Sequence, residues 1–239
     1  MANTPIADVL ITVGGHTIDI STQLTPGGQI EVVETVDGVQ TLDLILCFLE
    51  GTSIATASGS VKVESLNRGD MVMTADGVEA PVRWVGRRQV SKTFADPMQA
   101  APIRVSAGAL GENLPARDLF VSPGHALFID GVLVQASALV NGTSIVRETN
   151  MPESYTYYHV ELANHALVLA EGVAAETFID NASRMNFDNW AEHEALVDVA
   201  PIAEMAYPRA QSARQVPVAI LQKIASRSVR QFGVEAVAA

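Results

Sequence analysis

The feature that most constrains the fold is a succession of short β-forming runs separated by turn residues. The clearest pair covers residues 126–134, where Asp130-Gly131 separates two apolar runs. An Asp-Gly pair adopts the positive φ angles that a two-residue type I′ turn requires, so we expect a tight hairpin here. Asp76-Gly77 and Asp37-Gly38 are weaker turns of the same kind. This spacing of strands and turns predicts an all-β domain.

Further β-forming runs fall around these turns, and the pattern changes after about residue 185. The runs cover residues 61–63, 71–73, 81–85 and 155–169, the last of which is long enough for two strands. Residues 189–197 predict a short helix, and residues 217–232 carry apolar side chains at roughly helical spacing. We therefore expect a short N-terminal β segment over residues 1–46, a main domain over residues 47–184, and a helical or partly disordered tail over residues 185–239.

Charge restricts the partners of this chain. The 239 residues carry a net charge of −12, whereas binding to phosphate groups requires clustered Lys and Arg. We therefore expect no nucleic-acid partner and no membrane partner. Residues 201–239 differ, with five basic and two acidic residues. We expect this basic tail to dock on the acidic body of the protein.

The N-terminus is not that of a secreted protein with a cleaved signal. It lacks a basic start followed by an apolar core, and no apolar run in the chain is long enough to cross a bilayer. We expect cytoplasmic synthesis, and export by a route without a cleaved signal stays open.

Cys47 is the single cysteine of the chain. With a single cysteine, the chain cannot form an intrachain disulfide or a zinc ribbon. A lone cysteine in an apolar stretch such as residues 44–49 is most often an inert small hydrophobe. Ser122 and His125 form a Ser-x-x-His pattern directly before the predicted hairpin, and this pattern is weak by itself. The order of these residues along the chain raises their significance.

Several motifs in that order resemble the Hint (Hedgehog/intein) superfamily, and the similarity is closest to the bacterial Hint-domain family outside true inteins. The resemblance covers about residues 45–187. The motifs that carry it are residues 47–48 (CF), 69–72 (GDMV), 84–88 (WVGRR), 107–111 (AGALG), 114–119 (LPARDL), 121–125 (VSPGH), 165–173 (HALVLAEGV) and 175–178 (AETF). The resemblance implies a horseshoe of short strands and hairpins.

It also implies autocatalytic processing at the bond between Leu46 and Cys47. The Cys47 sulfur would attack the Leu46 carbonyl carbon, and this N-to-S acyl shift would convert the amide to a thioester. Water or an external nucleophile would then release residues 1–46, which makes the N-terminal segment the substrate of a single-turnover reaction. Neither a cofactor nor a metal is expected.

The resemblance also assigns roles to the polar side chains. His125 matches the histidine that protonates the departing amide nitrogen, and Ser122 matches a threonine that holds the scissile peptide. His165 matches a histidine that assists the second step, and His159 is a further candidate.

The chain departs from the family pattern at both ends of the domain. True inteins end in His-Asn followed by a nucleophile, and Asn181 lacks both neighbours. We therefore expect cleavage without full splicing. Leu46 stands where Hedgehog-type cleavage has glycine, and no sterol-recognition region is visible.

Three alternatives remain open. The first is a catalytically silent Hint-fold module with a structural or interaction role. The second is a Cys-His hydrolase that acts on other molecules, although such enzymes place the cysteine at a helix N-terminus. The third is a zinc site formed by Cys47, His125, His159 and His165, whose ligand types suit zinc but whose spacing fits no compact metal motif.

Overall fold

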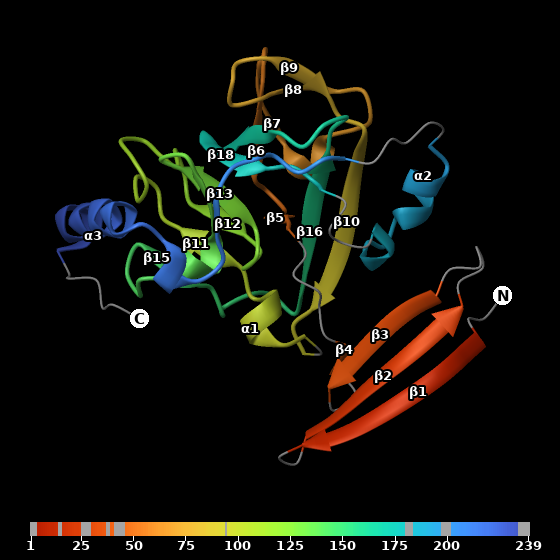
Figure 1. The fold of residues 1–239 in the computed structure, drawn as a ribbon. Helices are drawn as coiled ribbons and strands as arrows, with labels where there is room; N and C mark the ends of the chain where they lie inside the picture. Colours follow the sequence, from red (N-terminus) through yellow and green to blue (C-terminus); the bar gives the residue numbers. More distant parts are fainter. Residues whose placement is uncertain are drawn as a thin grey trace.

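Short antiparallel strands dominate the computed structural model of the chain (Figure 1). The structure describes residues 46–93, 95–179, 184–196 and 202–233, together with the backbone of four earlier strands. Those four form an antiparallel sheet in the order β1-β2-β3-β4, with bounds Thr4–Val13, His16–Leu24, Ile30–Val36 and Val39–Gln40. The predicted turn at Asp37-Gly38 lies outside the described residues.

A six-stranded sheet holds the segment that follows Cys47. Its order is β10-β16-β5-β12-β11-β15, with bounds Trp84–Ser91, Ser154–Glu161, Phe48–Leu49, Leu119–Val121, Ile103–Val105 and Ile145–Arg147. The long strands β10 and β16 pair along their whole length and lie side by side in Figure 1. Because β5 lies between β16 and β12, the short strand after Cys47 is enclosed on both edges.

A seven-stranded sheet carries the residues around His125. Its order is β19-β14-β13-β18-β17-β6-β7, with bounds Arg209–Ala210, Val132–Gln135, Ala126–Ile129, Val173–Glu176, Leu167–Ala170, Ser53–Thr56 and Gly59–Lys62. The predicted hairpin is confirmed as β13 and β14. Asp130 and Gly131 have φ angles of 47° and 86°, the positive values that a type I′ turn needs. A two-stranded sheet pairs β8 (Met71–Met73) with β9 (Glu79–Pro81).

One expectation for a strand needs correction. Residues 81–85 are not one strand, because β9 ends at Pro81 and β10 begins at Trp84. Val82 between them bonds to the turn at Gly69 and Asp70 through its N–H and C=O, so it takes no part in a sheet ladder. The two strands expected in residues 155–169 are confirmed as β16 and β17, which belong to different sheets.

The helices lie mostly in the C-terminal part of the described chain. They are α1 (Pro97–Ala100), α2 (Trp190–Glu194) and α3 (Val218–Phe232), with short 3-10 turns at Val63–Ser65, Ala136–Leu139, Arg184–Asn186 and Ala213–Gln215. Helix α3 confirms the helix expected over residues 217–232. No helix in the described ranges has the length and apolar character that crossing a bilayer demands.

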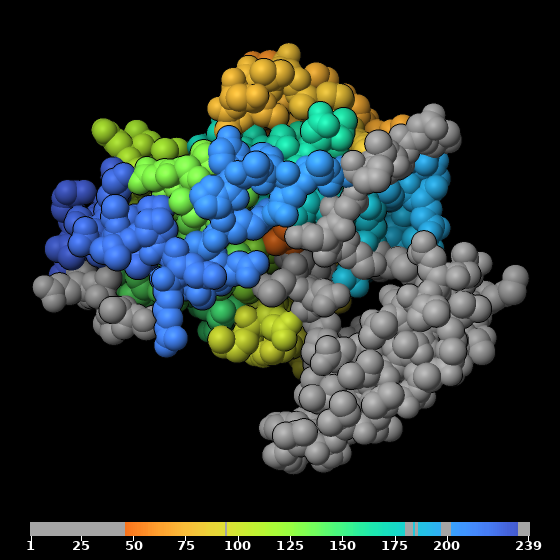
Figure 2. All heavy atoms as spheres, viewed as in Figure 1, coloured from red at the N-terminus to blue at the C-terminus, as the bar shows by residue number. Residues whose placement is uncertain are grey.

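The C-terminal segment packs on the domain. Ile220 and Ile224 of α3 join the main hydrophobic core, and the Ser228 hydroxyl lies 2.6 Å from that of Thr143. Lys223 pairs with Asp130 at the hairpin turn. Figure 2 shows the segment, in blue, laid across the face of the domain. These contacts agree with the expected docking of the basic tail on the domain. The predicted domain boundary between residues 184 and 185 stays a prediction.

Candidate active site

Cys47 lies one residue before β5, with no exposed surface. Its amide N–H donates a hydrogen bond of 2.8 Å to the Ser122 hydroxyl, and its carbonyl accepts one of 2.9 Å from the Ser122 N–H. The pairing of β5 with β12 brings these residues together. The amide nitrogen of the Leu46–Cys47 bond is therefore fixed by the residue that the sequence analysis singled out, inside a site closed to solvent.

The Cys47 thiol is a weak nucleophile in its resting state. Burial raises the pKa of Cys47 well above its ordinary value, and the positive charge of Arg88 opposes this only in part. The thiol is therefore protonated at neutral pH, and attack on a carbonyl requires a base that removes its proton. An external peptide does not reach a sulfur with no exposed surface, which argues against a hydrolase acting on other molecules.

His125 has the properties of such a base. The turn that holds it is closed by a bond from the His125 N–H to the Ser122 carbonyl, and its ring packs against Phe48 at 4.3 Å between centroids. The ring Nε2 lies 3.1 Å from the Glu176 carbonyl oxygen. Because a carbonyl oxygen only accepts, Nε2 carries the hydrogen, and Nδ1 of the neutral ring has a free lone pair. Among the described residues Nδ1 has no hydrogen-bond partner.

The environment keeps His125 neutral. Burial lowers the pKa of His125 below its ordinary value, while the charge of Glu176 and interactions with the backbones of Cys47 and Glu176 act in the opposite direction. A neutral imidazole at neutral pH can accept a proton at Nδ1 and release it again.

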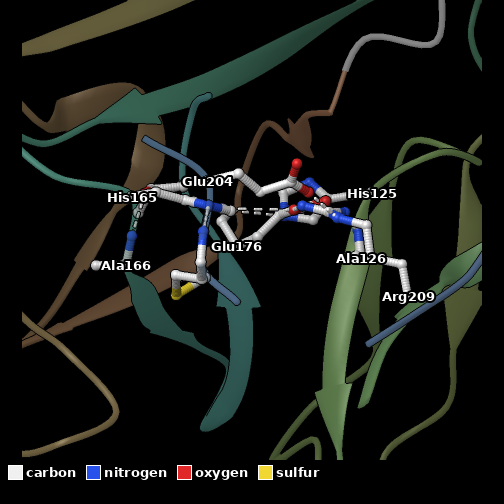
Figure 3. A network of polar contacts seen from close by, with 9 residues as sticks. His125, Ala126, His165, Ala166, Glu176, Glu204 and Arg209 are labelled. Atoms are coloured by element: carbon white, nitrogen blue, oxygen red, sulfur yellow. Dashed lines mark hydrogen bonds and ion pairs between the residues drawn. The ribbon is translucent and has the colours of Figure 1, made fainter. Parts of the chain in front are cut away.

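Glu176 connects the histidines to the C-terminal segment, as Figure 3 shows. Its fully buried carboxylate accepts bonds of 3.0 Å from the Ala126 N–H and 2.7 Å from Arg209 Nη2, and lies 3.5 Å from His165 Nε2. Burial alone would raise the pKa of Glu176, but its interactions with His165, Arg209 and His125, which include the hydrogen bond from Arg209, lower it. Glu176 and Arg209 are not among the predicted site residues, because a single charged residue in the sequence does not reveal that its side chain points inward.

His165 lies on the far side of Glu176 from His125 (Figure 3). Its Nδ1 accepts a bond of 2.9 Å from the Met205 N–H, so the hydrogen of the neutral ring is on Nε2, which faces Glu176. The structure therefore joins this predicted site residue to His125 through Glu176.

His159 faces His125 from β16. Its ring meets the His125 ring edge-on at 6.1 Å and stacks on Phe187 at 6.1 Å between centroids. Both of its nitrogens are buried and lack hydrogen-bond partners within the described ranges. Burial lowers the pKa of His159 well below its ordinary value, and electrostatic interactions with His125, His165 and Arg184 lower it further. His159 is therefore neutral and does not supply protons at neutral pH.

The described part of the chain does not place the residues of the zinc alternative in a metal-binding arrangement. No group of three or more His, Cys, Asp or Glu side chains in those ranges is positioned to hold a metal ion. In addition, the Met205 N–H already occupies Nδ1 of His165.

The buried histidines predict a loss of stability in mild acid. Unfolded His125 and His159 titrate near a pKa of about 6.5, whereas their folded pKa values are lower. Below about pH 6.5 the unfolded chain takes up protons that the folded chain does not, so the free energy of unfolding falls by up to about 1.4 kcal/mol per pH unit for each histidine until the folded pKa is reached. The lowered pKa of Glu176 acts only below about pH 4.5.

Urea unfolding of the Cys47→Ala chain at pH 7.5, 6.5 and 5.5 measures this slope. His159→Leu removes one titrating group and is expected to reduce it. A free energy of unfolding that stays constant over this range would contradict the expectation.

Comparison with known proteins places this site in a family. The sequence model of the Hint domain family matches residues 46–182. Similar solved structures include a bacterial intein-like domain from Clostridium thermocellum, at 18% identity over 56% of this chain and 99% of that one, with a TM-score of 0.39. The MchDnaB-1 intein is 15% identical over 55% of this chain and 99% of its own, with a TM-score of 0.38. No curated protein sequence matches. Because the family match spans more than half of the chain and begins at the residue before Cys47, the chain belongs to the Hint domain family and has its all-β fold.

Proposed function

We propose that the chain cleaves itself between Leu46 and Cys47 by an N-to-S acyl shift. The observation that carries this proposal is the hydrogen bond from the Cys47 amide nitrogen to the Ser122 hydroxyl, in a buried site that also contains His125. The amide nitrogen that must leave is thereby fixed close to a group that can protonate it. Nucleophile and carbonyl belong to neighbouring residues, so they react at a high effective concentration.

In the first step, His125 carries the proton from the thiol to the departing nitrogen. The Cys47 thiol transfers its proton to Nδ1 of His125, and the sulfur attacks the Leu46 carbonyl carbon. The bond from that carbon to the Cys47 nitrogen then breaks, and His125 returns the proton to the departing nitrogen. The products of this step are a Leu46 thioester on Sγ and a free amine on Cys47, and His125 ends as it began.

The second step hydrolyses the thioester. Water attacks the Leu46 carbonyl carbon and the Cys47 sulfur leaves as a thiol, which releases residues 1–46 with a new carboxylate. His165 would assist indirectly, through Glu176, because Glu176 separates it from His125 and from the scissile bond. His159 would act by packing against the His125 ring, since it is neutral.

Burial of the thiol favours a second candidate function. A cysteine with no exposed surface and a raised pKa also suits a Hint-fold module that keeps its peptide bond and serves a structural or interaction role. The two candidates differ in one measurable property, which is whether the Leu46–Cys47 bond breaks.

Intact mass over time decides between them. We expect the purified chain to release residues 1–46, faster when a thiol or hydroxylamine is added, because both intercept a thioester and leave an amide intact. Cys47→Ala removes the sulfur and is expected to abolish release altogether. A single uncleaved mass under every condition would refute self-cleavage and leave the silent module.

A further inference from the structure

Arg209 lies well beyond residue 182, where the family match ends, and yet its guanidinium reaches the centre of the site. We propose that the segment after the Hint domain completes the active site, with Arg209 holding Glu176 and thereby positioning His125. This inference rests on the proposed self-cleavage for its role in catalysis. The coupling between the three residues is a structural statement that can be tested without cleavage.

Glu176 needs a cation because of where it lies. Its side chain is 0% exposed, and an ionised carboxylate in such a place is costly without a charged partner. The groups that face it are the Ala126 N–H, His165, Arg209 and the neutral ring of His125. Arg209 is the only arginine or lysine among them, and on its other side it pairs with Glu204.

Two hydrogen bonds connect the position of Glu176 to that of His125. Its carboxylate accepts the N–H of Ala126, the residue after His125, at 3.0 Å. Its own carbonyl accepts from His125 Nε2 at 3.1 Å, which determines the nitrogen that carries the hydrogen. A displacement of Glu176 therefore moves the backbone that bears His125 and the acceptor that selects its tautomer.

The C-terminal segment is built to bring Arg209 to this place. Strand β19 pairs in parallel with β14, with Leu133 opposite Arg209 and Val134 opposite Ala210. Ala210 and then Val216 and Ile220 join the main core, which anchors the chain after the arginine. During synthesis the site is therefore incomplete until the chain beyond residue 210 has been made and has docked, so cleavage is delayed until then.

NMR on the full Cys47→Ala chain tests the coupling. In Arg209→Met the charge of Glu176 is uncompensated, so we expect the pKa of His125 to rise by about half a unit or more. We also expect the amide hydrogen of Ala126 to exchange about tenfold faster or more, since its acceptor is no longer held. Arg214→Met removes an equal charge from an exposed position of the same segment and is expected to change neither value.

Two further variants cover the case in which Arg209→Met does not fold. Arg209→Lys keeps the charge and is expected to retain the His125 pKa of the parent chain. The pair Glu176→Gln with Arg209→Met removes both charges and is expected to fold with a less protected Ala126 amide. An unchanged His125 pKa and Ala126 amide exchange in Arg209→Met would overturn the inference, and so would an unchanged Ala126 amide in the double variant if Arg209→Met does not fold.

Cleavage of the Cys47 chain then tests the role in catalysis. Arg209→Met is expected to slow release of residues 1–46 by about tenfold or more, a part of what positioned acid–base catalysis supplies. Arg209→Lys is expected to restore most of the rate, and the acid limb of the pH–rate profile should move up with the His125 pKa. If the parent chain never cleaves, the proposed function fails, and the NMR result still decides whether Arg209 is coupled to His125.

Discussion

His125→Ala is expected to slow self-cleavage by about 10²- to 10⁴-fold, the range that a positioned general acid–base contributes. The Cys47 thiol is protonated and buried, and the His125 ring, which interacts with the Cys47 backbone, has one nitrogen without a hydrogen-bond partner among the described residues. Without it, no group in the described site both removes the thiol proton and returns it to the amide nitrogen. Release of residues 1–46, followed by intact mass, measures the rate.

The pH–rate profile distinguishes this role from a structural one. The pKa of His125 lies below its ordinary value, so we expect the rate of the parent chain to stay level between pH 7 and 9 and to fall in acid. In His125→Ala only the thiolate fraction of Cys47 reacts. Because that pKa is well above its ordinary value, the rate should rise about tenfold per pH unit over the same range.

A second histidine provides the control. His193→Gln alters a buried histidine that contacts Glu161 and the Trp84 ring, and keeps a side chain that can donate a hydrogen bond. We expect its cleavage rate and pH profile to match those of the parent chain. Cleavage of His125→Ala within about threefold of the parent rate would exclude His125 as the proton carrier.

Local signals in the sequence were enough for much of the fold. The Asp130-Gly131 hairpin depends on two positive φ angles, and α3 depends on apolar residues at helical spacing followed by Gly233 in the left-handed conformation. The grouping of Cys47, Ser122 and His125 followed from motif order, and the structure brings the three together. Each of these features lies within a few neighbouring residues or in a motif shared by a family.

The rest of the site depends on pairings that local sequence does not encode. Glu176 is the one charged residue of the apolar strand β18 and stands at its end. The same sequence pattern would also suit a strand whose last side chain points into solvent. Arg209 resembles any basic residue of a solvated tail until β19 takes its register on β14. His159 and His165 fall in one run that was predicted to hold two strands. Because β16 and β17 join different sheets, the distinct surroundings of the two histidines were not visible beforehand.

Phe187→Ala is expected to lower the free energy of unfolding by about 3–5 kcal/mol, the usual cost of emptying a buried aromatic site. Phe187 falls after residue 184, in the part of the chain predicted as an accessory tail. Its side chain is nevertheless 2% exposed and meets the Trp84 ring edge-on at 5.2 Å. The glycine at position 86 allows this contact, since a Cβ there would lie 2.7 Å from both rings.

The prediction therefore tests whether the segment around Phe187 belongs to the domain. Urea unfolding of the Cys47→Ala chain, which is free of cleavage, gives the free energy of unfolding with and without the substitution. Phe232→Ala removes an equal ring at the end of α3, where the side chain is 42% exposed, and is expected to change stability by less than about 0.5 kcal/mol. Equal effects of the two substitutions would mean that residues 184–196 are an appendage, whereas a large difference would extend the folded domain past the end of the family match.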